Sequence, residues 1–180
     1  MKLFSTAVLT LLLIMVPQTP QAKPEGLVRS GEGDIRYLGL FHVYTAELFV
    51  GEGTRLSAVL DSQTSRCLAI RYTVDLSADD IVTGANAVLE RQHTEQHIRP
   101  FRHLIDQLHS AYQDINEGDS YNLCYDSDTK TNTLYLNDQA VVSLPSSDLA
   151  ALYFGIWLGE NRPIDASLRS ELLRGLTEIQ

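Results

Sequence analysis

The segment Gly31–Val50, GEGDIRYLGLFHVYTAELFV, decides how the first part of the chain folds. Its dense apolar residues predict two strands, Ile35–Leu38 and Leu40–Val50, which form a pair or one strand bent around Gly39. Both alternating faces of the second strand carry apolar residues. This pattern predicts that other elements cover both sides of the sheet.

Two polar side chains, Arg36 and Thr45, stand inside this apolar segment. An arginine is costly to bury without a partner. In one interpretation Arg36 lies at a strand edge, where its stem packs and its head reaches water. In the other, its guanidinium stands at the mouth of an apolar cleft and binds a carboxylate or an enolate. The Thr45 hydroxyl would then add a donor for the same oxygen.

The N-terminus has the pattern of a secretory signal peptide. Lys2 is followed by the mostly apolar run Leu3–Val16 and then by Pro17, too short a run to span a bilayer comfortably. We expect a signal peptide over residues 1–22, cleaved after Ala22, and a single domain over residues 23–180. The alternative is an uncleaved membrane anchor. The expected protein is exported and has no stable membrane insertion after cleavage.

The whole chain has 180 residues, of which 44% are hydrophobic, and a formal net charge of −9. Removal of residues 1–22 takes away Lys2 and no acidic residue, so the charge becomes −9 − 1 = −10. This acidic balance argues against nucleic acid as a partner and against binding to anionic membrane surfaces.

The sequence contains no phosphate loop, dinucleotide-binding fingerprint, nucleophile elbow or zinc spacing, so we expect no cofactor. The segment HTEQHIRPFRH places His93 and His97 four residues apart, with His103 further on. Two histidines at this spacing can share a metal on a helix, but a third ligand is missing. A solvated polar segment is the better interpretation, and we expect no metal.

Two cysteines, Cys67 and Cys124, fall in strand-like runs. In an oxidising compartment an even number of cysteines invites a disulfide. The alternative is a pair of small buried apolar side chains. The sequence does not show whether the two strands are neighbours.

The remaining apolar spacing alternates between strand and helix periods. Further strands are expected at Cys67–Val74, Tyr121–Tyr125, Thr133–Leu136 and Gln139–Leu144, the last two as a hairpin with its turn at Asn137 and Asp138. Helices are expected after the N-cap Ser77, with Asp80 completing a capping box, from Pro100 to Ile115, over Leu149–Trp157 and after the N-cap Asp165. Strands, then helices, then strands, then helices predict an α+β domain built on an antiparallel sheet.

Several segments, in order, resemble exported bacterial chalcone isomerase-like proteins. They are GEGDIR with HVYTAELFV, LAIRYTVDLSADDIV, INEGDSYNLCYD and FGIWLGENRPIDASLRSELL, and the similarity covers nearly all of residues 27–176. The resemblance implies a chalcone isomerase-like fold: a large antiparallel β-sheet with helices packed over it, an open-faced β-sandwich with a cleft between the layers. It also implies a periplasmic location.

The resemblance also suggests site residues. In plant chalcone isomerases an arginine and a threonine on early strands serve the reacting ligand, and in fatty-acid-binding members the arginine holds the lipid carboxylate. Arg36 and Thr45 match these positions, with a connection three residues shorter. The segment GANAVL places Asn86 where an asparagine is expected. The expected tyrosine and hydroxyl residue fall at about Asp79 and Ile156, which departs from the catalytic set.

The resemblance therefore implies a non-catalytic periplasmic protein that binds a fatty-acid-like or other amphipathic carboxylate. Arg36 is expected to face the cleft and hold the headgroup, with Thr45 and Asn86 also in the site. One alternative is an isomerase or lyase that acts on an unknown enone through Arg36 and Thr45, with no cofactor. Another is an adaptor whose cleft is filled by its own side chains.

Overall fold

Six antiparallel strands form one sheet, and their order in the sheet is their order in the chain. The computed structural model describes residues 26–176, so the predicted signal peptide lies outside the described residues. The strands are β1 (Leu27–Tyr37), β2 (Phe41–Gly51), β3 (Arg66–Tyr72), β4 (Ser120–Asp126), β5 (Thr131–Leu136) and β6 (Gln139–Pro145). The helices are η1 (Leu56–Ala58), α1 (Ala78–Gln92), α2 (Glu95–Ile98), η2 (Arg99–Phe101), α3 (Arg102–His109), α4 (Ser147–Leu158) and α5 (Ala166–Leu172). The predicted α+β class is confirmed.

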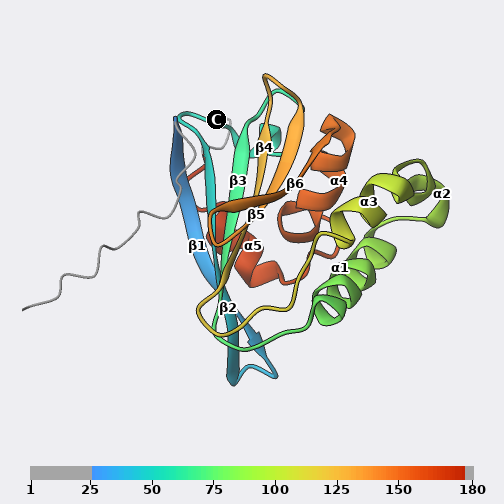
Figure 1. Cartoon of the computed structure of the whole chain (residues 1–180). Helices are drawn as coiled ribbons and strands as arrows, with labels where there is room; N and C mark the ends of the chain where they lie inside the picture. The colour runs from blue at the N-terminus through green and yellow to red at the C-terminus, as the bar shows by residue number, and fades with distance from the viewer. Residues whose placement is uncertain (1–25, 177–180) are drawn as a thin grey trace, which may run out of the picture.

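The helices cover one face of the sheet (Figure 1). Alternate residues of β2 face them and are buried: Tyr44, Ala46, Leu48 and Val50. Thr45 and Glu47 point to the opposite face and stay partly exposed. The prediction that both faces are covered was therefore wrong. Val43 and Phe49 resemble a second apolar face in the sequence, but the polar residues between them leave that face accessible to water.

Helix α5 sits directly on β1 because two glycines let it approach. A Cβ atom at Gly31 would overlap the backbone of Glu171 and Leu172, and one at Gly33 would collide with the side chain of Glu171. The Asp165 carboxylate caps α5 as predicted, since the backbone N–H of Leu168 donates to its Oδ1 at 2.8 Å. These contacts fix one side of the helix layer.

The helix predicted from Pro100 to Ile115 is shorter than expected. Helix α3 ends at His109, and the segments α2 and η2 precede it. Ile115 instead forms a backbone bridge with Leu76, in which each N–H donates to the other carbonyl at 3.1 and 2.9 Å. The apolar spacing continues beyond His109, but this long-range pairing holds Ile115 outside the helix.

The first strand is longer than expected, since β1 begins at Leu27 instead of Ile35, but several local predictions are confirmed. Ser77 and Asp80 form a reciprocal capping box at the start of α1. Asn137 and Asp138 turn the β5–β6 hairpin with φ values of 47° and 66°. The predicted strand from Cys67 corresponds to β3. Because β3 and β4 are neighbours, Cys67 lies opposite Cys124 and the two form a disulfide.

Candidate functional site

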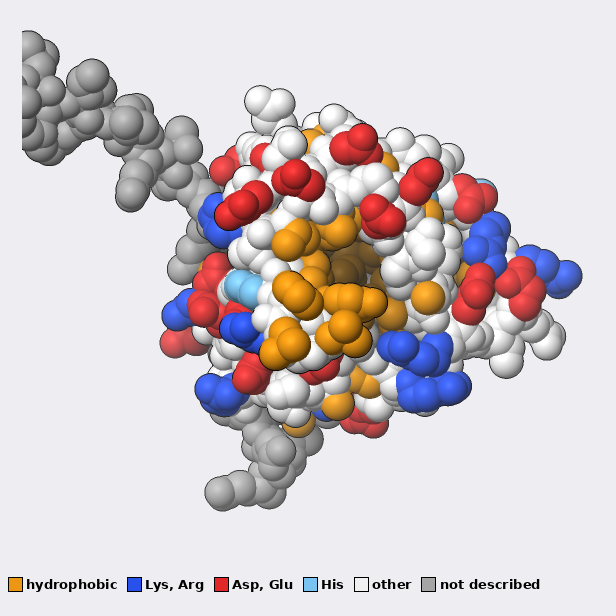
Figure 2. All heavy atoms as spheres, turned by 90° about the horizontal axis from the view of Figure 1, so that it is seen from below, with side chains coloured by type: hydrophobic (Ala, Val, Ile, Leu, Met, Phe, Trp, Pro, Cys, Tyr) orange, Lys and Arg blue, Asp and Glu red, His pale blue; other side chains and the backbone are white. Residues whose placement is uncertain are grey.

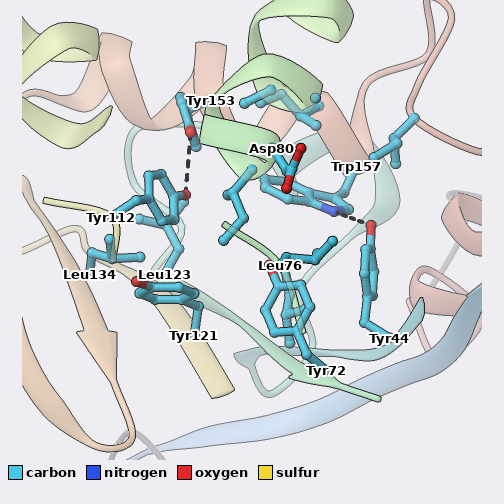
Figure 3. A pocket seen from close by; sticks show the side chains of 16 residues that line it. Tyr44, Tyr72, Leu76, Asp80, Tyr112, Tyr121, Leu123, Leu134, Tyr153 and Trp157 are labelled. Carbon is cyan, nitrogen blue, oxygen red and sulfur yellow. Dashed lines mark hydrogen bonds between the residues drawn. The ribbon is translucent and has the colours of Figure 1, made fainter. Parts of the chain in front are cut away.

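An apolar cavity of about 140 Å³ lies between the covered face of the sheet and helices α1 and α4. Figure 2 views the molecule from the end where the β1–β2 hairpin projects, and there hydrophobic side chains surround a hollow. Six aromatic residues line the cavity: Tyr44, Tyr72, Tyr112, Tyr121, Tyr153 and Trp157 (Figure 3). Asp80 and Gly84 line it as well and are exposed, so they mark its opening.

The cavity exists because small residues of α1 face the sheet. Gly84 and Ala85 both line it, and a Cβ atom at Gly84 would meet no neighbouring atom within 4 Å. The sheet supplies large rings opposite them, since Tyr44 and Tyr72 are paired neighbours on β2 and β3. Helix α1 therefore packs at its buried residues Val88 and Leu89 and leaves space near its N-terminal half.

The cavity is mostly apolar, and two of its tyrosine hydroxyls, those of Tyr44 and Tyr72, are available to donate to a ligand. Trp157 Nε1 donates to the Tyr44 hydroxyl at 3.1 Å, which leaves the Tyr44 O–H free to donate in turn (Figure 3). Within residues 26–176 the Tyr72 hydroxyl forms no hydrogen bond to another side chain or backbone group. Burial raises the pKa of both tyrosines, so both stay neutral donors. An apolar pocket with few polar groups suits an amphipathic ligand.

His109 lies next to Tyr153, a residue of the cavity wall. The Tyr153 hydroxyl is 3.2 Å from His109 Nε2 and 3.3 Å from the Tyr112 hydroxyl. Burial lowers the pKa of His109 to about 4 from its ordinary value of 6.5. His109 is therefore neutral in the folded protein at neutral pH.

We expect the free energy of unfolding to fall as the pH is lowered through the range from 6.5 to about 4. In that range the unfolded chain binds a proton at His109 and the folded chain does not, so protonation favours unfolding. The expected decrease is of the order of 2 kcal/mol, discounted for the partial exposure of the ring. Carboxylates with a lowered pKa, such as Asp34 and Asp80, lose their contribution only below this range.

Urea unfolding across this pH range checks the prediction, with His109→Gln as the comparison. Glutamine keeps a hydrogen-bonding group near Tyr153 but does not titrate, so the variant should lose less stability on acidification. Identical pH dependence in the two proteins would show that His109 does not cause the decrease.

Arg36 and Thr45 lie together, but outside the cavity. Both bind Asp34: Arg36 Nη2 donates to Oδ2 at 3.2 Å, and Thr45 Oγ1 donates to Oδ1 at 2.8 Å. Asp34 lies opposite Thr45 in the strand register, on the face away from Tyr44. The hydrogen bond from Thr45 is the main reason why the pKa of Asp34 is lowered.

The structure thus does not meet the expectation that Arg36 faces the cleft. Its side chain is 49% exposed and paired with Asp34, as in the strand-edge interpretation. Asn86 is half-buried on α1 and does not line the cavity either. Whether these three residues contact a ligand stays a prediction. Ile156, which stands where the resemblance led us to expect a hydroxyl residue, does line the cavity.

The aromatic lining is the part of the site that sequence reasoning did not single out. The signal was present in Tyr44, Tyr72 and Tyr121, which follow the two-residue period of the covered face. Such tyrosines are most often core residues, and the sequence could not show that Gly84 leaves space above them.

The structure places two of the three histidines of the segment HTEQHIRPFRH side by side. The rings of His93 and His97 stack with centroids 4.9 Å apart, and His103 is exposed on α3. Within residues 26–176 no three His, Cys, Asp or Glu side chains are grouped to hold a metal ion. In the same range, no helix has the length and apolarity needed to cross a bilayer.

An open antiparallel sheet with helices on one face and an apolar cavity between the layers defines the class of this protein. The chain belongs to the chalcone isomerase-like family, whose profile matches residues 12–174. The resemblance found in the sequence and the fold that it implied are both confirmed.

Among solved structures, the chain is similar to the fatty-acid binding protein AtFAP1 of Arabidopsis thaliana. The TM-score is 0.64 at 15% identity, over 86% of this chain and 90% of that chain. At this identity the similarity shows the shared fold. No curated protein matches the sequence.

Proposed function

We propose that the protein is a periplasmic carrier or sensor that binds a fatty-acid-like carboxylate, with the hydrocarbon tail in the cavity. The aromatic-lined cavity beneath α1 is the observation that carries this proposal. The fatty-acid binding neighbour of the same fold supports it. The Cys67–Cys124 disulfide supports an oxidising compartment, consistent with the predicted signal peptide.

The cavity volume sets an expectation for the tail. An engineered apolar cavity of about 150 Å³ binds benzene, so a cavity of about 140 Å³ holds a group of that size with no rearrangement. A short tail of roughly six carbons therefore fits inside. A longer tail extends through the opening or moves the tyrosine rings.

Affinity for linear alkanoates should rise with tail length until the cavity is filled. Each methylene transferred from water contributes about 0.8 kcal/mol, which is roughly fourfold in the dissociation constant. We expect this increment up to about six carbons and a smaller one beyond. Titration calorimetry with a series of alkanoates measures it. Affinity that does not depend on tail length would contradict tail burial in the cavity.

The carboxylate is expected within reach of the Tyr44 and Tyr72 hydroxyls, which can donate to it. Arg36 follows Ile35, which lies opposite Tyr44, but its side chain binds Asp34 and has to turn toward the cavity to reach the carboxylate. The Arg36–Asp34 pair is exposed, and such pairs contribute only about 0–1 kcal/mol. Exchanging Asp34 for a ligand carboxylate therefore costs little.

Arg36→Ala should weaken alkanoate binding about fivefold, because a partly exposed charge-assisted hydrogen bond contributes about 1 kcal/mol. The fold should stay intact. Arg29→Ala is the matched control, since Arg29 is also an ion-paired arginine of β1, bound to Glu32 and Glu47. Equal affinities of the two variants would show that Arg36 does not hold the headgroup, and an unfolded Arg36 variant would show a structural role.

No observation favours the enone isomerase. That alternative requires both Arg36 and Thr45 to leave Asp34, on the face away from the cavity, and converge on a substrate, whereas the carrier requires only Arg36 to exchange its partner. The ligand-free adaptor is kept as an outcome of the binding experiments.

A further inference from the structure

The tip of the β1–β2 hairpin exposes an unusual number of large apolar side chains. Tyr37, Leu38, Leu40 and Phe41 are 65%, 73%, 76% and 62% exposed. Within residues 26–176 the only other exposed large hydrophobic residue is Val28, at 42%. The hairpin tip projects beyond the rest of the sheet at the lower end of the molecule (Figure 1). We call residues 37–41 the hairpin tip.

The backbone conformation at the hairpin tip is unfavourable for Leu38. Leu38 and Gly39 have φ values of 52° and 71°, and the Leu40 N–H closes the turn onto the Tyr37 carbonyl at 3.1 Å. The left-handed region suits glycine and asparagine, and leucine is strained there. Leu38 also packs into no core. A strained apolar residue pointing at water indicates that its side chain has a partner outside the chain.

The hairpin tip lies beside the opening of the cavity. Figure 2 shows that exposed apolar side chains continue to the edge of the hollow. Tyr44, a residue of the cavity wall, follows Phe41 by three positions on the same strand, so the tip and the cavity wall are close along β2.

We propose that the hairpin tip inserts into the surface of a lipid bilayer and brings the cavity opening against it. The tip is uncharged, with an aromatic residue at each end and two leucines between them, and amphipathic aromatic rings favour the membrane interface. The contact is peripheral. With a net charge of −9, the protein gains nothing from anionic lipid, so the bilayer that it fits is a neutral, zwitterionic one.

A second copy of the chain fits the hairpin tip less well. The four side chains expose roughly 500 Å², whereas a stable interface buries about 800 Å² on each partner. Bilayer insertion needs no complementary protein surface. The docking stands independently of the proposed ligand, and only the transfer of a lipid from the bilayer into the cavity rests on the proposed function.

Flotation with phosphatidylcholine vesicles tests the docking. The test variant is Leu38→Asn with Leu40→Ser, in which asparagine suits the left-handed turn, so the hairpin should fold as before. Val28→Ser is the matched control, since it removes an exposed apolar residue of β1 far from the hairpin tip. We expect the wild type and Val28→Ser to float with the vesicles, and the floated fraction of the tip variant to drop at least tenfold.

Two further measurements separate the possible failures. Hexanoate binding in solution should be the same in the wild type and the tip variant, because no tip residue lines the cavity. A wild type that floats but does not bind hexanoate would contradict the proposed function and leave the docking standing. The docking proposal is overturned if the wild type does not float, if the tip variant floats equally well, or if flotation requires phosphatidylglycerol. Concentration-dependent dimers that the tip variant abolishes, without flotation, would assign the hairpin tip to a second copy instead.

Discussion

Gly84→Leu should abolish alkanoate binding without destabilising the protein. A Cβ atom at Gly84 meets only open space, and the residue lines the cavity. The leucine side chain would therefore occupy the volume that the ligand tail needs. We expect at least a hundredfold loss of affinity, about 3 kcal/mol, which is the contribution of several buried methylenes.

The stability of this variant should rise. Leucine is favoured over glycine in a helix interior by about 0.8 kcal/mol, and its burial in the cavity adds apolar contacts. Ala87→Leu is the matched control, because Ala87 is an exposed residue of the same helix and does not line the cavity. Calorimetric titration and urea unfolding measure the two effects. Wild-type affinity in Gly84→Leu would mean that the ligand binds elsewhere.

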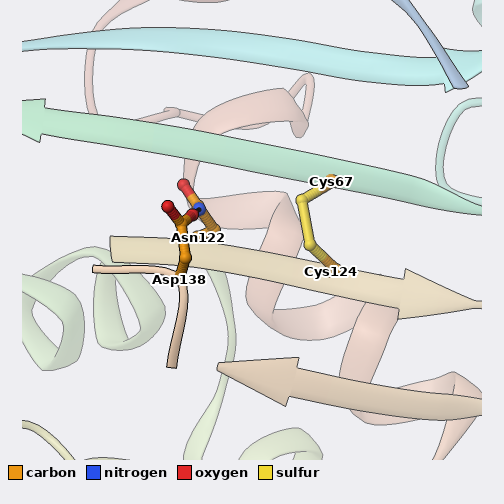
Figure 4. Close-up of a disulfide and its surroundings, with 4 residues drawn as sticks. All are labelled: Cys67, Asn122, Cys124 and Asp138. Carbon is orange, nitrogen blue, oxygen red and sulfur yellow. Dashed lines mark hydrogen bonds between the residues drawn. A yellow bond between two sulfur atoms is a disulfide. The ribbon is translucent and has the colours of Figure 1, made fainter. Parts of the chain in front are cut away.

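Loss of the Cys67–Cys124 disulfide should have the largest effect on stability. The two residues are 57 positions apart and join the central strands β3 and β4 (Figure 4). In the chain-entropy treatment, opening a loop of this length costs about 4 kcal/mol, although measured values are often lower. The double variant Cys67→Ala with Cys124→Ala should show this decrease in the free energy of unfolding.

The single variants distinguish the bridge from packing. Either substitution breaks the bridge, so each should lose nearly as much stability as the double variant. If the two single losses are small and add up to the double loss, the cysteines contribute as buried side chains rather than as a bridge. Cys67 is 1% exposed, so alanine is used to avoid burying a new hydroxyl group.

The fold was predictable from the sequence because local signals and the family resemblance agreed. The capping box at Ser77, the turn at Asn137 and Asp138, and the cap at Asp165 all occur where predicted. The errors arose where long-range contacts override local spacing. Ile115 pairs with Leu76 instead of extending a helix, and one face of β2 stays uncovered.

The site was harder to predict, because a sequence does not show which arginine is buried. The sequence pointed to Arg36 as the arginine among apolar residues, but in the structure the buried arginine is Arg66. Its side chain is 0% exposed, lies between the rings of Tyr125 and Phe154, and donates to the carbonyls of Asp61 and Thr64. Arg66 directly precedes the strand expected from Cys67, and the sequence pattern did not single it out. Arg36, in contrast, has a side chain that is 49% exposed and forms an ion pair with Asp34.

The aromatic cavity also escaped prediction for a physical reason. A cavity is the space left when large residues on one layer face small residues on another. That Gly84 lines the same cavity as Tyr44 and Tyr72 is a tertiary property, which neither segment of the sequence shows alone.

Native mass spectrometry of the mature protein isolated from the periplasm, followed by organic extraction, tests the central claim most directly. Gly84→Leu, prepared in the same way, is the comparison. We predict an added mass on the wild type that extraction identifies as a carboxylated lipid, and no added mass on Gly84→Leu. A single mass equal to the bare chain in both proteins would contradict lipid binding and favour the ligand-free adaptor.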